Sequence, residues 1–391
     1  MKTKMTAIVG GGPAGALAAE KLARGGARVV VFEEKTGWEK PCGGGLSHKA
    51  LRRYPFLAEV TGHGKSVRDA EFVAPEGASV CFRLRQPLVI YARCTLNQML
   101  LRAAEEAGAQ IIPDRILGFR RAGWRWELQG QRGTYAADFL VLAAGARTRL
   151  RRLFVEDFGA GDFMLTLGYF VPSADDLLRI QFFQDFEGYA WAFPRVDHLS
   201  VGICGKVGKN RMSALRERLQ GFIERFGYST QNAPIYSHLL PALTVESWNN
   251  LRLAGTGWAL AGDAAGLVDP VTGEGIYYAM RSGELLAESL LAEAPELYPA
   301  RVWEEFGKAL ALGARLAHLF YYGDFLGEAV TTRLVEFGAK SHKFLEVIQD
   351  LIEGSQSYLG LTARLYLGLT RTLFEVAAAS LSEAWAGSKA A

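Results

Sequence analysis

Gly10-Gly11-Gly12-Pro13-Ala14-Gly15 stands near the start of this 391-residue chain, between an apolar run and a segment of good helix formers. The run Met5–Val9 precedes it, and the Ala- and Leu-rich stretch Ala14–Arg24 follows it. A second apolar run, Arg28–Phe32, comes next. These patterns predict a strand, a glycine turn, a helix and a second strand, which together make one βαβ unit.

The glycines have the G-x-G-x-x-G spacing that binds the pyrophosphate of a dinucleotide. Gly10 permits the tight turn after the strand, Gly12 leaves room for the phosphates, and Gly15 lets the helix pack close to the strand. The helix start at Pro13 and Ala14 offers free N–H groups to the phosphates. Because the chain has 44 glycines, the position of the loop between strand and helix carries this prediction, not the pattern alone.

An acidic pair follows the second strand. Glu33 comes 18 residues after Gly15, where the acid that binds ribose hydroxyls stands in such units. Its neighbour Glu34 is the alternative, but alternation along the strand points the two side chains in opposite directions. We therefore predict that Glu33 binds the ribose of the cofactor.

A second glycine-rich segment lies far along the chain. An apolar run from Trp258 leads into Gly262-Asp263, and then Pro270, Gly273, Gly275 and Ile276 open a helix. The Asp263 carboxylate suits the hydroxyls of a polyol chain. N–H groups bared at Gly273 and Gly275 would face a flavin carbonyl that carries negative charge in the reduced state. Together with the first loop, this segment favours FAD over NAD as the bound cofactor.

With these residues the sequence resembles the FAD-dependent oxidoreductases of the para-hydroxybenzoate hydroxylase superfamily, and within it the geranylgeranyl reductase branch. Two further motifs carry the resemblance, Pro41-Cys42-Gly43-Gly44-Gly45-Leu46 and Tyr189-Ala190-Trp191-Ala192-Phe193-Pro194. The resemblance implies that Gly262-Asp263 surrounds the ribityl chain and that Arg93 touches the cofactor. It also implies that Cys42, Gly43 and Gly44 lie beside the flavin.

Two positions depart from the family pattern. Ala144-Gly145 stands where the hydroxylases carry an Asp-Gly pair that contacts both FAD and NAD(P)H. We still expect Ala144 and Gly145 beside FAD, but the direct use of a nicotinamide stays open. The second departure is Cys204, which replaces a glycine in a G-x-G motif after the aromatic stretch.

The expected fold class is α/β, or α+β overall, with a Rossmann-type FAD domain, an antiparallel-sheet substrate domain and a C-terminal helical region. We predict a discontinuous FAD domain over residues 1–65, 86–155 and 252–290. The sheet domain is expected at 66–85 and 156–251, and the helical region at 291–391. In that region Leu365, Leu369 and Leu373 recur at helical spacing, which favours core or inter-helix packing and leaves a lipid-facing surface open.

Composition limits the partners. A net charge of +3 gives no indication of nucleic acid binding, and the four cysteines form no CxxC pair, so no metal site is expected. The basic run Arg147, Arg149, Arg151 and Arg152 is expected to form a solvated loop. No apolar run reaches the roughly 20 residues of a membrane span. We expect a cytoplasmic protein with possible peripheral membrane contact.

Aromatic residues mark the expected substrate side. Tyr189, Trp191 and Phe193 alternate with alanines and so share one face of a strand. They either fill a core or wall an apolar tunnel for a prenyl chain, to which Phe183 would add. Cys42 precedes three glycines and is either a proton donor or thiol relay, or a packing residue.

These observations predict an FAD-dependent reductase of isolated C=C bonds in a prenyl or other lipid-like substrate, with hydride delivered from reduced flavin N5. Tyr189, Trp191 and Cys42 are the expected catalytic residues. The alternative is an FAD-dependent monooxygenase of an apolar or aromatic substrate, against which Ala144 argues. The sequence leaves open the exact substrate, the oligomeric state and the electron donor, either NAD(P)H or ferredoxin.

Overall fold

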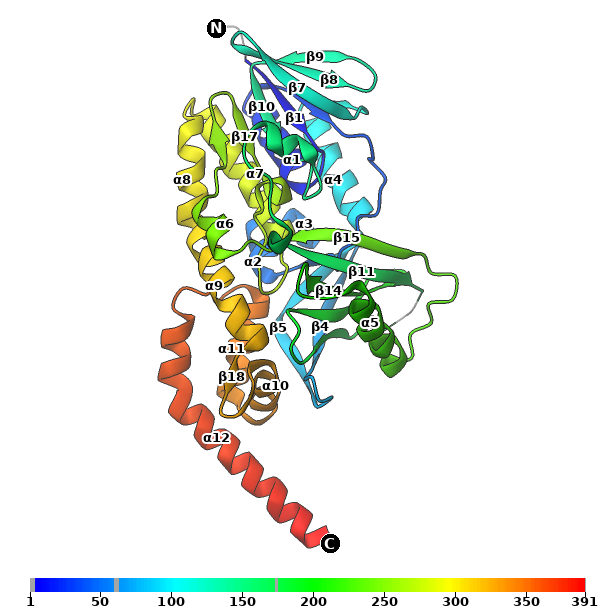
Figure 1. Ribbon diagram of the computed structural model, residues 1–391, viewed down its shortest axis with the longest axis vertical. Helices are drawn as coiled ribbons and strands as arrows, with labels where there is room; N and C mark the ends of the chain where they lie inside the picture. The colour runs from blue at the N-terminus through cyan, green and yellow to red at the C-terminus, as the bar shows by residue number, and fades with distance from the viewer. Residues whose placement is uncertain (1–3, 60–62, 173–174, 391) are drawn as a thin grey trace. The chain divides into compact units, whose positions relative to one another are not determined.

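The computed structural model describes residues 4–59, 63–172 and 175–390 (Figure 1). The chain divides into two compact units, each built from three separate segments. The first unit comprises Met1–Cys42, Ala92–Leu165 and His238–Ala314. The second unit comprises Gly43–Tyr91, Thr166–Ser237 and Arg315–Ala391.

A mainly parallel sheet forms the centre of the first unit, with the strand order β16-β17-β10-β1-β2-β6. β1 pairs in parallel with both β2 and β10, and only β16 runs antiparallel to its neighbour. Its strands are β1 (Met5–Val9), β2 (Arg28–Phe32), β6 (Gln110–Ile112), β10 (Phe139–Leu142), β16 (Ala254–Gly255) and β17 (Trp258–Leu260). Both faces of a parallel sheet are covered by helices, which explains why the strands are continuous apolar runs.

Three helices of this unit pack against one another through small residues. Helix α1 (Pro13–Arg24) contacts both α4 (Arg93–Glu106) and α7 (Ile276–Leu291). Gly283 makes the approach of α7 possible, because a Cβ there would lie 2.2 Å from the carbonyl oxygen of Ala14. The alanine-rich face of α1 is therefore a requirement of close helix packing.

The remaining elements of the first unit are short. Strands β7, β8 and β9 form a separate antiparallel sheet, and in the sequence they lie between β6 and β10 of the parallel sheet. These elements are β7 (Ile116–Ala122), β8 (Arg125–Gly130), β9 (Thr134–Ala137), α6 (Val245–Asn249) and α8 (Tyr298–Val302). β8 pairs antiparallel with both β7 and β9.

The second unit contains a larger sheet with the order β15-β11-β14-β13-β12-β4-β5-β3. β13 pairs antiparallel with both β12 and β14, and β5 pairs antiparallel with both β3 and β4, whereas β12 and β4 are parallel. The strands are β3 (Gly45–Leu46), β4 (Gly64–Val73), β5 (Ser79–Tyr91), β11 (Phe163–Val171), β12 (Leu178–Phe182), β13 (Gly188–Pro194), β14 (Leu199–Lys206) and β15 (Ile235–Pro241). Residues 66–85 were predicted to belong to the sheet domain, but the long β4–β5 hairpin itself was not named, although Val80, Phe82 and Leu84 alternate with exposed residues as in a half-buried strand.

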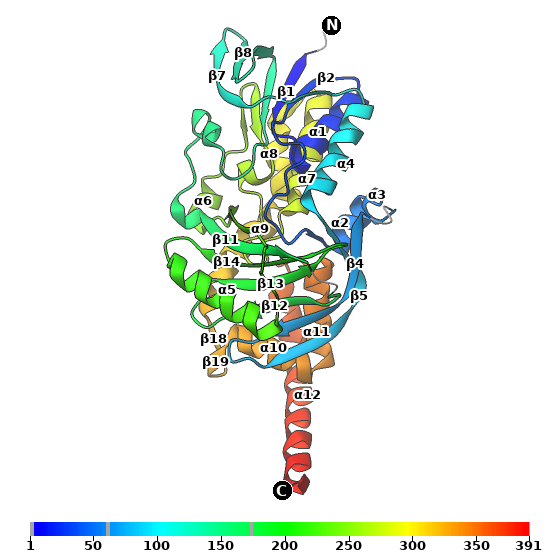
Figure 2. The same ribbon diagram turned by 90° about the vertical axis from the view of Figure 1, so that its right-hand side faces the viewer.

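Helices pack against this sheet in the second unit. Helix α5 (Met212–Phe226) contacts β14, and α10 (Val330–Lys340) and α11 (His342–Glu353) contact β5 (Figure 2). Val347 and Ile348 of α11 are buried, as the helical spacing predicted. Helix α9 (Lys308–Tyr322) begins in the first unit and ends in the second. A short hairpin of β18 (Asp324–Phe325) and β19 (Glu328–Ala329) follows it, and α12 (Leu361–Ala390) is the last helix.

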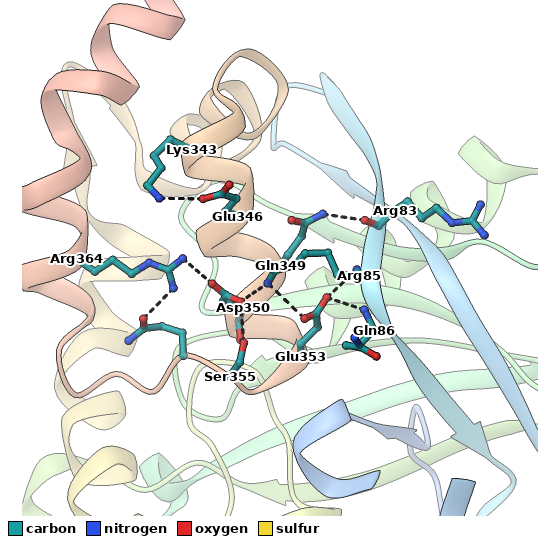
Figure 3. Close-up of polar contacts among 11 residues, drawn as sticks. Arg83, Arg85, Gln86, Lys343, Glu346, Gln349, Asp350, Glu353, Ser355 and Arg364 are labelled. Atoms are coloured by element: carbon teal, nitrogen blue, oxygen red, sulfur yellow. Dashed lines mark hydrogen bonds and ion pairs between the residues drawn. The ribbon is translucent and has the colours of Figure 1, made fainter. Parts of the chain in front are cut away.

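Polar contacts join α11 to the long hairpin (Figure 3). The Glu353 carboxylate accepts hydrogen bonds from the backbone N–H groups of Arg85 and Gln86, at 2.8 and 3.0 Å. The Arg85 guanidinium pairs with Asp350, and the Gln349 side chain donates to the carbonyl of Arg83 at 2.8 Å. Because Glu353 is buried, these bonds fix α11 on the strand more strongly than exposed ion pairs would.

The predicted fold class is confirmed, whereas the compact units follow boundaries that differ from the predicted domains. Residues 43–59, 63–65 and 86–91, which were assigned to the FAD domain from sequence, belong to the second unit. The C-terminal region is divided at Ala314 between the two units. Leu365 and Leu373, expected in a helix interface, are 37% and 39% exposed. Within the described residues, no helix is long and apolar enough to cross a membrane.

Candidate cofactor and substrate site

The glycine loop has the geometry that its spacing predicts. Gly10 has φ +105°, and a Cβ on Gly15 would lie 2.0 Å from the carbonyl oxygen of Gly10. Neither position accepts a side chain without moving backbone. A Cβ on Gly12, by contrast, would meet no atom within 4 Å. Open space at Gly12, beside the first turn of α1, is what a pyrophosphate on a helix N-terminus requires.

Glu33 lies directly at this loop. Its Oε2 accepts a hydrogen bond from the Gly11 N–H at 2.8 Å, and its Oε1 accepts one from the Lys35 N–H at 2.9 Å. Each carboxylate oxygen keeps a further lone pair for a ribose hydroxyl. Glu34 is exposed and no hydrogen bond of its side chain joins it to the loop. The structure thus brings Glu33, and not Glu34, to the glycine loop.

The second glycine-rich segment also lies in the first unit. Gly262 has φ +60° and donates its N–H to the Ser282 hydroxyl at 3.0 Å. Asp269 accepts hydrogen bonds from the N–H groups of Val271 and Thr272, both at 2.9 Å, which shapes the turn after Pro270. Gly273 follows with φ +71°, and Gly275 precedes the first residue of α7, Ile276.

Asp263 lies at the centre of a charged cluster that the sequence did not reveal. The Lys40 ammonium donates to its Oδ2 at 2.6 Å. Burial raises the pKa of Asp263, but Lys40 and Arg93 outweigh it, so the net pKa lies below the ordinary value and the carboxylate is ionised. Lys40 comes just before the Cys42 loop in sequence, and sequence spacing gave no indication that its side chain pairs with Asp263.

Arg93 contributes a buried cation to the same cluster. The side chain is 4% exposed, and its Nε finds no hydrogen-bond acceptor among the described residues. Glu39 holds the start of α4 in place, because its carboxylate accepts from the N–H groups of Arg93 and Cys94, both at 2.8 Å. Glu39, like Lys40, was missed because its partner lies far along the chain.

These features fit FAD. The open space at Gly12 suits the pyrophosphate, the lone pairs of Glu33 suit the ribose, and the unused Nε donor of Arg93 suits an oxygen acceptor. A buried donor without an acceptor costs about 1–3 kcal/mol, so a ligand that accepts from Arg93 Nε regains that free energy. The individual contacts of Gly262, Asp263, Gly273 and Gly275 with the cofactor stay predictions.

His238 provides a titration test of this cluster. Burial, and next the Lys40 ammonium, lower the pKa of His238 to about 3. An unfolded chain has a histidine pKa near 6.5, so below pH 6.5 the unfolded state binds one proton more than the folded state. The free energy of unfolding should therefore fall as pH falls from about 6 to 4, by up to ~1.4 kcal/mol per pH unit from this residue.

His238→Gln is expected to flatten this pH dependence, measured by denaturant unfolding of the FAD-loaded protein between pH 4 and 6.5. The exposed His63 serves as the control, and His63→Gln should keep the slope of the parent protein. An unchanged slope in His238→Gln would show that the imidazole stays protonated in the folded cluster.

The basic run after β10 is only partly the solvated loop that we predicted. Arg147 and Arg149 are exposed, but Arg151 is 6% exposed and its guanidinium lies 3.7 Å from the centre of the Phe158 ring. Burial lowers the pKa of Arg151 below its ordinary value. The prediction was wrong for this residue, because a cation–π contact replaces water around it.

Ala144 and Gly145 lie at the end of β10. The backbone of Ala144 abuts the glycine loop, since a Cβ on Gly10 would lie 2.7 Å from the Ala144 Cα. Gly145 has φ +77°. The departure from the Asp-Gly pattern therefore removes a carboxylate from the immediate neighbourhood of the loop.

In the second unit, the glycines after Cys42 lie flat on an aromatic ring. A Cβ on Gly43 would come 2.6 Å from Phe193 Cδ2, and one on Gly45 would come 3.2 Å from its Cε2. Gly44 has φ +83°, and a Cβ there would lie 2.1 Å from the carbonyl oxygen of Tyr91. Only glycines fit these positions. Cys42 itself, the last residue of the first segment of the first unit, is half-buried.

Strand β13 presents the aromatic face that the alternation predicted. Ala190 and Ala192 are fully buried on one side, while Tyr189 and Trp191 contact each other on the other with ring centres 6.0 Å apart. Trp191 is buried: its ring covers Gly202, and its Nε1 donates to the Ser200 hydroxyl at 3.3 Å. Trp191 thus packs as a core residue, and Tyr189 and Phe193 keep partial exposure.

Phe183 directly follows β12 and Cys204 lies in β14, and these are the two strands that flank β13. Phe183 contacts Phe186 with ring centres 5.6 Å apart and is half-buried. Cys204, the residue in place of a family glycine, is buried, and desolvation raises the pKa of its thiol to about 12. The thiol of Cys204 is therefore neutral and acts as packing. The roles of Phe183, Tyr189, Trp191 and Phe193 toward a substrate stay predictions.

Residues 4–177 match the pyridine nucleotide-disulphide oxidoreductase family model. Among curated relatives, the geranylgeranyl diphosphate reductase of rice chloroplasts is 29% identical over 73% of this chain and 66% of its own length. Among solved structures, a geranylgeranyl bacteriochlorophyll reductase-like protein of Thermoplasma acidophilum superposes with a TM-score of 0.73 at 20% identity, over 94% of this chain and 99% of that one. A flavin-dependent brominase superposes with a TM-score of 0.68 at 17% identity, over 90% and 93%.

Proposed function

We propose that this chain, an FAD-dependent oxidoreductase with geranylgeranyl reductases among its relatives, reduces isolated C=C bonds in a prenyl or other lipid-like substrate. The observation that carries the proposal is the apolar character of the substrate-side surface of the second unit. Tyr189 and Phe193 are its half-buried aromatic residues on β13, and the neutral, buried thiol of Cys204 lies on the neighbouring strand β14, opposite Tyr189. A hydrocarbon chain binds such a surface by the hydrophobic effect alone.

FAD, when bound and reduced, supplies the hydride for one alkene carbon. The chain's own residues then have three tasks. The glycine loop, Glu33 and Arg93 hold the cofactor, the aromatic face of β13 binds the apolar chain and excludes water, and one group donates a proton to the second alkene carbon. One hydride and one proton balance the reduction of one double bond.

Cys42 is the proposed proton donor, because it immediately precedes the flat glycine loop and is half-buried. General acid catalysis typically contributes about 10²–10⁴ in rate. Cys42→Ala is expected to lower kcat by about 10²-fold while FAD binding, read from the flavin spectrum, stays unchanged. Cys94→Ala is the matched control, since Cys94 is also a half-buried thiol, at the start of α4. An equal loss in both variants would assign Cys42 to packing.

The reductase proposal is tested by anaerobic incubation of the dithionite-reduced holoenzyme with geranylgeranyl diphosphate and with a longer polyprenyl lipid. The expected products gain mass in steps of two hydrogens, seen by mass spectrometry, and the bound flavin is oxidised in equal amount. No mass gain with any prenyl substrate, while the flavin remains reduced, contradicts the proposal.

An FAD-dependent monooxygenase of an apolar substrate is the second candidate. The superposition on a flavin-dependent brominase supports it only through the shared fold. NAD(P)H-dependent oxygen uptake that an apolar substrate stimulates would support this candidate. Ala144 argues against it, because no carboxylate stands at the position where the hydroxylases use one.

A further inference from the structure

Helix α12 presents a stripe of apolar residues to solvent. Leu367, Phe374 and Leu381 are 86%, 73% and 72% exposed, although each is a residue that normally lies in a core. The three are seven residues apart, so they lie on one side of the helix. Three small residues, Ala363, Thr370 and Ala377, are also exposed, and each comes four residues before one of the large residues. We call these six positions the α12 stripe.

The spacing of the stripe is that of a helix–helix seam. From Ala363 to Leu381 its positions alternate by four and three residues, the a and d spacing of coiled coils. Large residues occupy one class of position and small residues the other. The stripe spans about 27 Å of helix at 1.5 Å per residue, and no charged side chain lies within it.

The opposite face of α12 is already occupied within the second unit. Arg364 donates to Asp350 at 2.5 Å and to Gln356 at 3.0 Å (Figure 3). Glu375 accepts from the Ser341 hydroxyl at 2.7 Å, and hydrogen bonds from Ser341 and Arg371 lower the pKa of Glu375 to about 2. Helix α12 is therefore held by its polar side, and its apolar side is turned outward.

The order of large and small residues is self-complementary when two copies run antiparallel. Positions equidistant from Thr372 then face each other across the seam, and each pair joins one large and one small residue. The pairs are Ala363 with Leu381, Leu367 with Ala377, and Thr370 with Phe374. A parallel pair would instead place large residues opposite large ones and leave gaps at the small ones, which is poor packing.

We propose that the α12 stripe is the interface of a two-fold symmetric dimer, formed by antiparallel pairing of α12 with α12 of a second copy. A two-fold axis through the seam generates this contact from one self-complementary surface. The charge pattern favours a second copy over a lipid surface. Interfacial membrane helices carry Lys and Arg along their polar side, whereas on α12 Arg364 pairs with Asp350 of α11 and Arg371 pairs with Glu375 of α12 itself.

Sedimentation velocity of the FAD-loaded full chain is the first test. The chain mass is 42.8 kDa, and the expected species at high concentration has twice that mass. The double variant Leu367→Glu/Phe374→Glu should remain monomeric with its circular dichroism spectrum unchanged. Leu326→Glu is the control: Leu326 lies in the β18–β19 hairpin, is 60% exposed and should leave dimer formation intact. A parent chain that is monomeric at every concentration, or a dimer that persists in the double variant, overturns the proposal.

Cross-linking tests the antiparallel register and does not depend on the folding of the charged variant. Leu367→Cys and Ala377→Cys are made in a Cys81→Ser background, since Cys81 is the exposed native thiol. With a short bis-maleimide, the equimolar mixture should cross-link efficiently and each variant alone should not. Efficient cross-linking of each variant alone indicates a parallel pair and contradicts the register.

Vesicle co-sedimentation decides between a second copy and a lipid surface. Vesicles of phosphatidylcholine, with and without phosphatidylserine, are mixed with the parent chain and with Leu367→Glu/Phe374→Glu. The expected result is that the two proteins bind equally weakly. A monomer that binds the vesicles through Leu367 and Phe374 would assign the stripe to a membrane and overturn the dimer.

Discussion

Replacing Gly12 by valine is expected to abolish FAD retention while the protein stays folded. A Cβ at this position meets no atom of the described residues within 4 Å, and Gly12 has the extended dihedrals φ −69° and ψ −177° that any residue adopts. The free energy of unfolding of the cofactor-free protein should therefore fall by no more than about 1 kcal/mol, the cost of an apolar residue before a helix. The valine would instead fill the space of the pyrophosphate, and the affinity for FAD should fall at least ~100-fold, which is about 2.7 kcal/mol.

Gly15→Val is the matched contrast in the same loop. Its Cβ would lie 2.0 Å from a backbone carbonyl, so we expect a loss of several kcal/mol of stability and little folded protein. Flavin fluorescence titration and guanidinium unfolding separate the two effects. Parental FAD affinity in a folded Gly12→Val protein would place the pyrophosphate somewhere other than this loop.

Replacing Arg281 by methionine is expected to destabilise the first unit by about 3–5 kcal/mol, because a buried ion cluster loses its only shared cation. Arg281 is 6% exposed in α7 and donates to Glu284 at 2.8 Å, to Glu288 at 3.2 Å and to Glu305 at 2.6 Å. Glu284 is equally buried and also pairs with Lys21, at the longer distance of 3.7 Å. A charge left in the interior costs far more than a charge at the surface.

Arg120→Met controls for the loss of an arginine as such. Arg120 pairs with Glu127 through two bonds of 3.0 and 2.8 Å, but the side chain is 72% exposed. Its loss should cost about 0–1 kcal/mol. Denaturant unfolding with equal slopes for both variants checks the comparison. A similar small loss in Arg281→Met would mean that water enters the cluster and solvates the remaining carboxylates.

Elements of the first unit were predictable where a short sequence pattern is sufficient to specify a strand, a turn or a helix. Arg28–Phe32 is a strand with the bounds read from its apolar run, and α1 begins at Pro13 where the glycine loop ends. Such segments bury a continuous apolar surface whatever surrounds them. The β4–β5 hairpin was not named from the sequence, although Val80, Phe82 and Leu84 alternate with exposed residues. The partners of Arg83, Arg85 and Gln86 on α11 come some 260 residues later, so no local pattern indicates them.

The candidate site divides in the same way. Gly12, Gly15 and Glu33 were identified by their sequence spacing, because the single βαβ unit that contains them brings them together. Lys40 and Glu39 were not, because the first finds Asp263 and the second finds the start of α4 only in the folded chain. Arg151 was expected in water, and a contact with Phe158 that sequence spacing does not encode buries it.

By itself the sequence determined the βαβ unit, the FAD cofactor and the relationship to geranylgeranyl reductases, since these depend on glycines at short, ordered spacings. Only the tertiary structure decided which charges surround Asp263, which aromatic rings of β13 stay accessible, and which face of α12 remains uncovered. The spacing of Leu365, Leu369 and Leu373 indicated a helix, but Leu365 and Leu373 are 37% and 39% exposed, where packing in a core or between helices was favoured. Whether a helical residue is buried depends on what packs against the helix. A periodic sequence predicts which residues share a face, but it does not predict what covers that face.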